Sequence, residues 1–132
     1  MIDILESLDW HYQASSPTKI RSGWKGQFHY FPLTIQIESS LVSLNVGPLF
    51  NIDFIPDEKK IYSLLNTLNQ DLKFCKLYIC PESLLNLKCE ISDFNLSEDS
   101  FEHAIGILDY YANILPEQLR PQFTESGVWQ FN

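Results

Sequence analysis

The side chains that could carry chemistry include three histidines, and two of these have no catalytic or metal-binding group at a suitable spacing. His11 lies between two aromatic residues, and His29 falls in a predicted strand. His103 follows Glu102 directly and lies four residues after Asp99, an arrangement that could form one corner of a metal site on a helix. Because exposed helix faces are commonly charged, solvated helix surface is the simpler interpretation. We therefore expect no bound metal and no cofactor.

The three cysteines do not form a redox or metal motif. Cys75, Cys80 and Cys89 are an odd number and contain no CxxC pair, which disfavours both a secreted disulfide framework and a zinc site. Cys80 would lie at an exposed turn, where only Lys76 and Lys88 are near enough to lower the pKa of its thiol. No GxSxG motif is present, and the five glycines are too scattered to form a phosphate-binding loop. We predict no catalytic residue and expect the protein not to be an enzyme.

Aromatic residues are the strongest remaining signal. Six of them lie in the first 31 positions, namely Trp10, Tyr12, Trp24, Phe28, Tyr30 and Phe31. They could fill the core of a small sheet or form a patch that receives another chain, because aromatic residues are frequent in both settings. Tyr30 and Phe31 are consecutive, so in a strand they point to opposite faces and at least one of them reaches a second surface. Our candidates for contact with a partner are Trp24, Phe28, Tyr30, Phe31, Tyr111 and Ile114.

Composition limits the class of protein. The chain has 132 residues, with 9 basic and 17 acidic side chains and a net charge of −8, which suits one globular domain. With 3 Trp, 6 Tyr and 9 Phe it carries too much apolar surface to stay unfolded. Because the chain is acidic and has no basic stripe, we expect no nucleic acid as a partner. The chain has no apolar run of membrane-spanning length, and its start is acidic, unlike a signal peptide. We expect a cytoplasmic protein that does not bind membranes.

Charge is distributed unevenly along the chain. Residues 1–52 hold four acids and three bases, whereas residues 53–132 hold thirteen acids and six bases. Between Lys88 and Arg120 there is no basic residue at all. We therefore predict a two-sided molecule, in which an aromatic side binds a partner and an acidic side selects or solubilises it.

Hydropathy patterns predict the elements of the N-terminal half. A short amphipathic helix opens the chain near residues 2–8, and Ser15-Ser16-Pro17 breaks it. Apolar residues then alternate with polar ones from Trp24 to Val46, which predicts two or three antiparallel strands with a turn at residues 38–40. Gly47-Pro48 is expected to end these strands. Asp57 begins a predicted helix over residues 57–72, whose apolar stripe is Ile61, Leu64, Leu65, Leu68 and Leu72.

The C-terminal half is predicted to be a hairpin followed by a long helix. Residues 74–80 and 84–91 form the hairpin, and pairing Ile79 with Leu87 would bury Cys75 and Cys89 and turn Cys80 outward. Ser97 begins the helix, and Pro116 and Pro121 are expected to end it. Its buried stripe is Phe101, Ala104, Ile105, Leu108, Ala112 and Leu115. Further apolar residues, Ile107, Tyr110, Tyr111 and Ile114, exceed what one sheet face requires and imply a second contact, for example with another copy of the chain.

These elements predict an α+β fold in the order α-β-β-β-α-β-β-α, with a β-meander and a hairpin in one antiparallel sheet that packs against helices. We expect a single domain over residues 1–132, with its core at about 24–118 and an aromatic tail at 119–132.

The segment from Leu64 to Phe74 carries a family resemblance. It contains Leu65-Asn66 and Leu68-Asn69, and a hairpin and an acidic helix that begins at Leu96-Ser97-Glu98 follow it. In this order of elements, over roughly residues 28–118, the chain resembles the YbjN-like bacterial sensory transduction regulators, which have the fold of type III secretion chaperones. The aromatic start and the tail from Val128 to Asn132 depart from the family pattern.

The resemblance implies a chaperone or assembly factor that holds a peptide segment or terminal extension of another protein. Some cyanobacterial relatives clasp an extension of a carboxysome shell protein, and a partner of this kind is one implied candidate. The alternative from another class is a regulator that responds to a small ligand or to a metal held by Asp99, Glu102 and His103.

Overall fold

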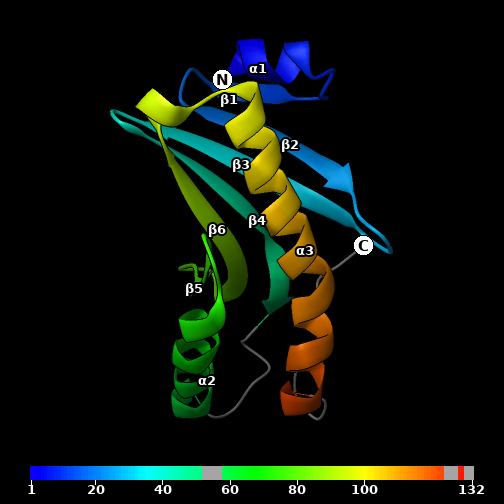
Figure 1. Ribbon diagram of the computed structural model, residues 1–132. Helices are drawn as coiled ribbons and strands as arrows, with labels where there is room; N and C mark the ends of the chain where they lie inside the picture. The colour runs from blue at the N-terminus through cyan, green and yellow to red at the C-terminus, as the bar shows by residue number, and fades with distance from the viewer. Residues whose placement is uncertain (52–57, 124–127, 130–132) are drawn as a thin grey trace.

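A curved antiparallel sheet with helices on one face makes up the computed structural model, which describes residues 1–51, 58–123 and 128–129. The helices are α1 (Ile2–Ser7), α2 (Glu58–Asp71) and α3 (Glu98–Phe123), with a short 3-10 helix, η2 (Asp93–Asn95), before α3. The strands are β1 (Gln13–Ser16), β2 (Lys19–Lys25), β3 (Tyr30–Glu38), β4 (Leu41–Asn51), β5 (Lys76–Ile79), β6 (Leu84–Ser92) and β7 (Val128–Trp129). Figure 1 shows α3 crossing in front of the sheet, with α1 above it and α2 beside β5.

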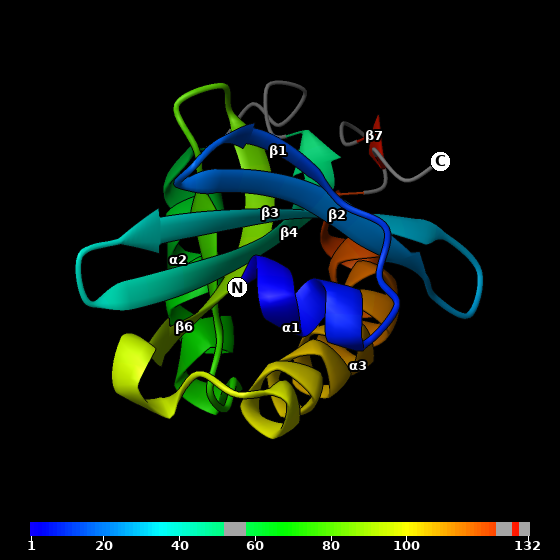
Figure 2. The ribbon, with the colours of Figure 1, turned by 90° about the horizontal axis from the view of Figure 1, so that it is seen from above.

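The predicted α+β fold and its order of elements are confirmed. The strands lie in the order β1-β2-β3-β4-β6-β5, and β7 pairs with the end of β4. Seen from above, β1 to β4 curve around one side of α1 and α3 (Figure 2). A short strand at the edge, β1, is added to the predicted meander, so Ser15 and Ser16 continue an extended segment where we expected a break. The turn between β3 and β4 falls at residues 39–40, as predicted.

Alternating side chains divide the sheet into a core face and an outer face. Leu33 and Ile35 of β3 and Leu44 of β4 are buried, whereas Thr34 and Gln36 between them are only half-buried. All three helices add apolar residues to the same core. The alternation of apolar and polar residues in the sequence therefore identified the buried face of each strand, because helices cover only one face of this sheet.

Gly47-Pro48 does not end β4, so this prediction was wrong. The strand runs to Asn51, and the register to β6 shifts between Val46 and Phe50. A proline cannot donate to the ladder, but a local irregularity in pairing accommodates it within the strand. Beyond that point Phe50 pairs with both Leu85 and Trp129.

The hairpin of β5 and β6 has a register two residues from the predicted one. Leu87 pairs with Leu77, and Ile79 pairs with Leu85, where we expected Leu87 opposite Ile79. A shift of two residues keeps every side chain on its face. Cys75 and Cys89 are accordingly buried, as predicted, and Cys80 is half-buried.

Both long helices form where their apolar stripes predicted them. The Ser97 hydroxyl caps α3 by accepting a hydrogen bond from the Ser100 N–H at 3.1 Å. The helix does not end at Pro116 or Pro121, as we expected, but continues to Phe123. Leu115 and Leu119 are each 1% exposed on either side of Pro116, and this burial offsets the roughly 3 kcal/mol that a proline costs inside a helix. The predicted cap Asp57 and half of the aromatic tail, residues 124–127 and 130–132, lie outside the described residues.

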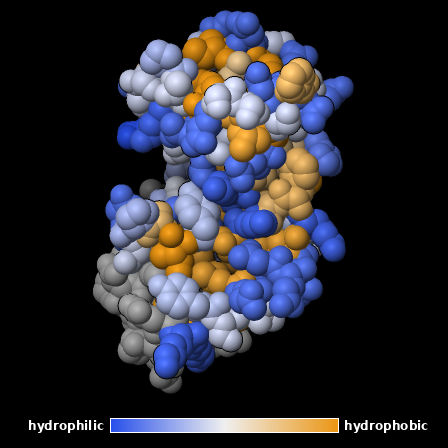
Figure 3. Space-filling view, turned by 90° about the vertical axis from the view of Figure 1, so that its left-hand side faces the viewer, coloured by the Kyte–Doolittle hydropathy of each residue, from blue (hydrophilic) through white to orange (hydrophobic). Residues whose placement is uncertain are grey.

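Apolar side chains also reach the surface. Figure 3 shows the side of the molecule on which α2 and β5 lie, where apolar residues show between polar ones over its lower part. Within the described residues no helix combines the length and apolar character needed to cross a bilayer.

Candidate functional site

The six candidate contact residues fall into two groups. Trp24, Tyr111 and Ile114 are half-buried, and Phe31 is fully buried. Phe28 and Tyr30, in contrast, are 75% and 51% exposed. The register explains the division, because Trp24 pairs with Phe31 and Lys25 with Tyr30, so that neighbouring pairs point to opposite faces. Of the consecutive pair Tyr30-Phe31, only Tyr30 reaches the surface.

Part of the aromatic cluster is structural. The ring of Trp10 lies 5.2 Å from that of Phe101 and 6.2 Å from that of Trp24, and Trp24 lies 5.6 Å from Phe31, between ring centroids. This row of rings packs β2 and β3 onto the start of α3. Phe31 therefore fills the core, and Trp10 and Trp24 pack against the core while remaining half-buried.

The exposed part of the cluster lies at the loop between β2 and β3. The Gly26 N–H donates to the His29 carbonyl at 2.7 Å and closes this loop. Gly26 also lies directly against Phe31, since a Cβ atom at this position would come within 2.8 Å of Phe31 Cδ2. The absence of a side chain here lets the loop pack onto the core while Phe28 stays in solvent.

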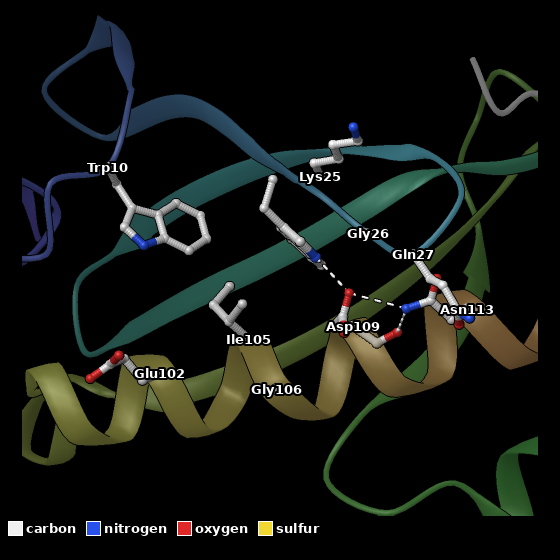
Figure 4. Close-up of a pocket in the computed structure, with 10 residues that line it drawn as sticks. Trp10, Lys25, Gly26, Gln27, Glu102, Ile105, Gly106, Asp109 and Asn113 are labelled. Atoms are coloured by element: carbon white, nitrogen blue, oxygen red, sulfur yellow. Dashed lines mark hydrogen bonds between the residues drawn. The ribbon is translucent and has the colours of Figure 1, made fainter.

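A cleft of about 570 Å³ separates this loop from α3. It is lined by Trp10, Trp24, Lys25, Gly26, Gln27, Glu102, Ile105, Gly106, Asp109 and Asn113. Trp24 Nε1 donates to Asp109 Oδ1 at 2.8 Å, and Asn113 Nδ2 donates to the same oxygen at 3.1 Å. Dashed lines in Figure 4 mark these bonds, of which the first holds β2 to α3 across the cleft and the second stays within α3.

The predicted separation of an aromatic side from an acidic side is wrong. Glu102 and Asp109 line the same cleft as Trp10 and Trp24, because α3 crosses in front of β2 and β3 (Figure 1). Neither Asp109 nor Trp10 was among the contact residues that the sequence predicted. Glu102, Ile105, Asp109 and Asn113 follow one another at helical spacing, which places them along one face of α3, and this signal could have grouped them.

Comparison with known proteins identifies the fold. No family model matches the chain, and no curated protein does either. A chain of the heterodimeric ExoU-SpcU complex from the type III secretion system of Pseudomonas aeruginosa superposes with a TM-score of 0.65 at 18% identity, over 92% of this chain and 99% of that one. YbjN from E. coli superposes with a TM-score of 0.66 at 9% identity, over 96% of this chain and 92% of YbjN. This chain has the YbjN-like, type III secretion chaperone-like fold. The fold that the resemblance implied is therefore confirmed.

On this chaperone-like fold, the other flank of α3 carries a second, mainly apolar pocket of about 320 Å³. It is lined by Lys73, His103, Gly106, Ile107, Tyr110 and Tyr111. The Tyr111 hydroxyl accepts a hydrogen bond from the Lys73 N–H at 3.1 Å and so fixes the segment after α2. Tyr110 is 60% exposed. The surplus apolar surface predicted for this helix is therefore only partly used within the chain.

The histidine corner suggested by the sequence does not come together as a metal site. In the part of the chain that the structure describes, no group of three or more His, Cys, Asp or Glu side chains could hold a metal ion. The His103 ring instead packs edge-on against Phe74, with 5.7 Å between ring centroids.

The two buried thiols are poorly suited to nucleophilic chemistry. Burial raises the pKa of Cys75 to about 11. Burial, together with Cys75 and Glu90, raises the pKa of Cys89 to about 12. Since the thiolate is the reactive form, both groups are inert at neutral pH.

Proposed function

We propose that this protein is a non-enzymatic protein-binding module, a chaperone or assembly factor that holds a segment of a partner protein. The observation that carries the proposal is the pair of exposed aromatic residues, Phe28 and Tyr30, at the end of the β2–β3 hairpin, where Gly26 and Gln27 line the cleft. Fully burying an aromatic side chain such as Phe stabilises a complex by about 1.5–3 kcal/mol, and aromatic residues are common anchors at interfaces. The ExoU-SpcU complex, one chain of which shares the fold, is itself a complex of two proteins.

The partner should present a peptide segment or a terminal extension rather than a nucleic acid or a membrane. A net charge of −8 repels phosphate backbones and favours partners rich in Lys or Arg. A carboxysome shell protein with an extension is the specific candidate that the family resemblance implies. It is tested by co-expressing this chain with such a shell protein, with and without its extension.

The experiment for the binding surface compares two double variants. In the first, Phe28→Ser and Tyr30→Ser remove the exposed aromatic pair. In the matched control, Phe94→Ser and Tyr62→Ser remove the same two residue types from other surfaces, where Phe94 is 98% and Tyr62 57% exposed.

Affinity capture by the tagged protein should lose its main partner in the first double variant and keep it in the control. Circular dichroism checks that both variants remain folded, which their exposure favours. Equal capture by the two double variants would show that the loop between β2 and β3 is not the binding surface.

Self-association is a second candidate, favoured by the α3 flank described above. Tyr110 is largely exposed beside an apolar pocket formed with Ile107, and a second copy of the chain could cover this surface. Sedimentation over a dilution series should then show a dimer that Tyr110→Ser weakens. A monomer at every micromolar concentration would contradict the homodimer.

A further inference from the structure

Gly106 leaves a gap on α3 that packing within the chain does not require. It lies inside the 26-residue helix α3, is exposed, and a Cβ atom placed on it would meet no atom within 4 Å apart from the backbone of its own helix. Glycine inside a helix costs about 1 kcal/mol relative to alanine. Gly106 lines both the cleft beside Trp24 and the apolar pocket on the other flank. Gly106 therefore leaves a depression in the surface of α3 between the cleft and the apolar pocket.

The cleft carries negative charge that its own side chains do not neutralise. Asp109 Oδ1 accepts hydrogen bonds only from neutral donors, the indole of Trp24 and the amide of Asn113. Asp109 Oδ2 accepts none from a described residue, and Glu102 at the other end of the cleft is exposed. Lys25 is the basic residue of the lining, but Figure 4 shows its side chain pointing away from α3. Asp109 thus keeps an unused carboxylate oxygen below an aromatic wall, and Glu102 adds negative charge about two turns away along α3.

We propose that this cleft binds an arginine side chain of the partner segment, with Asp109 Oδ2 accepting a hydrogen bond from the guanidinium group, Trp24 packing against it and Glu102 adding negative charge farther along α3. This inference rests on the proposed function and names the chemistry of the partner. A guanidinium group has planar N–H donors that can reach the unused carboxylate oxygen while its face stacks on an indole. Lysine offers a point charge without that planar fit and should bind more weakly. The fixed orientation of Trp24, set by its bond to Asp109, prepares both contacts before the partner arrives.

Gly106 gives the partner's backbone a place to cross α3. With no Cβ at this position, a main chain can approach the helix closely. A segment crossing here places the arginine in the cleft on one side. The next side chain on the other side reaches the apolar pocket of Ile107, Tyr110 and Tyr111. The partner motif is therefore an arginine next to an apolar residue.

The test uses random 12-residue peptides displayed on phage and selected against the full chain. Synthetic peptides from the enriched sequences are then measured by fluorescence anisotropy with arginine, lysine or citrulline, its neutral isostere, at the enriched position. We expect citrulline to weaken binding at least tenfold, about 1.4 kcal/mol, and lysine to weaken it less. Asp109→Asn should weaken the arginine peptide by about three- to tenfold, Glu102→Gln should weaken it less because its charge is more distant, and Gly106→Leu should abolish binding.

The control variant is Asp99→Asn, which makes the same charge change on the same helix outside the cleft and should alter affinity less than twofold. In Asp109→Asn the amide oxygen can still accept from Trp24, and Glu102 is exposed, so both variants should fold. Selected peptides that bind citrulline and arginine forms equally, or that lose the same affinity in Asp99→Asn as in Asp109→Asn, overturn the arginine site alone. Failure to select any peptide that binds the wild-type chain contradicts the proposed function as well.

Discussion

Replacing Gly106 with alanine should stabilise this protein, although glycine lies beside the site. The added methyl group meets no side chain within 4 Å, so it neither makes nor strains a packing contact. Only the helix propensity of the residue changes. That change favours alanine by about 1 kcal/mol. For 132 residues, unfolding entropies of about 2.1 cal/mol/K per residue convert this gain into a rise in Tm of about 3–4 °C.

The same methyl group at Gly26 should have the opposite effect. There it would approach the buried ring of Phe31, with Cδ2 at 2.8 Å, and Phe31 is 0% exposed and cannot move aside freely. Overpacking of this kind costs about 1–3 kcal/mol. Gly26→Ala is therefore the matched control for Gly106→Ala, because the chemical change is identical and only the surroundings differ.

Urea denaturation followed by circular dichroism measures both effects, with the slope of each transition checked against the wild type. A Gly106→Ala variant that is less stable than the wild type would refute the reasoning, since it would mean that α3 does not have an open, regular helical surface at this position. A Gly26→Ala variant of unchanged stability would show that the loop between β2 and β3 is not packed against Phe31.

The remaining predictions concern the thiols and the aromatic residues. A thiol reagent at pH 8 should modify Cys80 first, because Cys75 and Cys89 are buried, and three equal rates would contradict this burial. Burial raises the pKa of Cys75 to about 11 and that of Cys89 to about 12, against 9.0 for a free thiol. As the pH rises, the unfolded chain therefore loses these two thiol protons before the folded chain does. Their contribution to the free energy of unfolding is complete below pH 9 and should fall as the pH rises from 9 to 12. Replacing both by alanine should flatten that fall in denaturation curves measured against pH. Phe31→Ala should lower the free energy of unfolding by about 3–5 kcal/mol, whereas Phe28→Ala should change it by less than about 0.5 kcal/mol; similar values for the two would contradict the division of the aromatic cluster.

Local patterns predicted the fold well where one face of an element is buried. The alternation in β3 and β4 and the stripe of α2 identified core residues, because these periods follow from backbone geometry alone. The same local rules failed at Gly47-Pro48 and at Pro116. At both places a proline was expected to end an element, yet the strand and the helix continue. Proline tends to end a helix or a strand, but burial on either side of Pro116 and irregular pairing around Gly47-Pro48 outweigh that tendency here. The sequence alone does not show these tertiary contacts.

The candidate site was less accessible to sequence reasoning. Aromatic residues near the start and acids near the end were both recognised, but they were assigned to different sides of the molecule. Trp24 and Asp109, which hydrogen-bond across the cleft, are 85 residues apart. Their meeting depends on how α3 crosses the sheet, and helical spacing shows only that Glu102, Asp109 and Asn113 share a face.

The sequence by itself determined the fold class, the order of elements, the buried pair of cysteines and the excess of negative charge. Each of these depends on composition or on a short-range period. Only the tertiary structure decided which aromatic residues reach solvent and which acids face them. Phe31 and Tyr30 are neighbours in the chain, yet Phe31 is buried and Tyr30 is exposed. The pairing of β2 with β3 and the position of α3 determine which face of the sheet is covered. The cleft that joins Trp24, Gly106 and Asp109 exists only because long-range packing brings these two halves of the chain together.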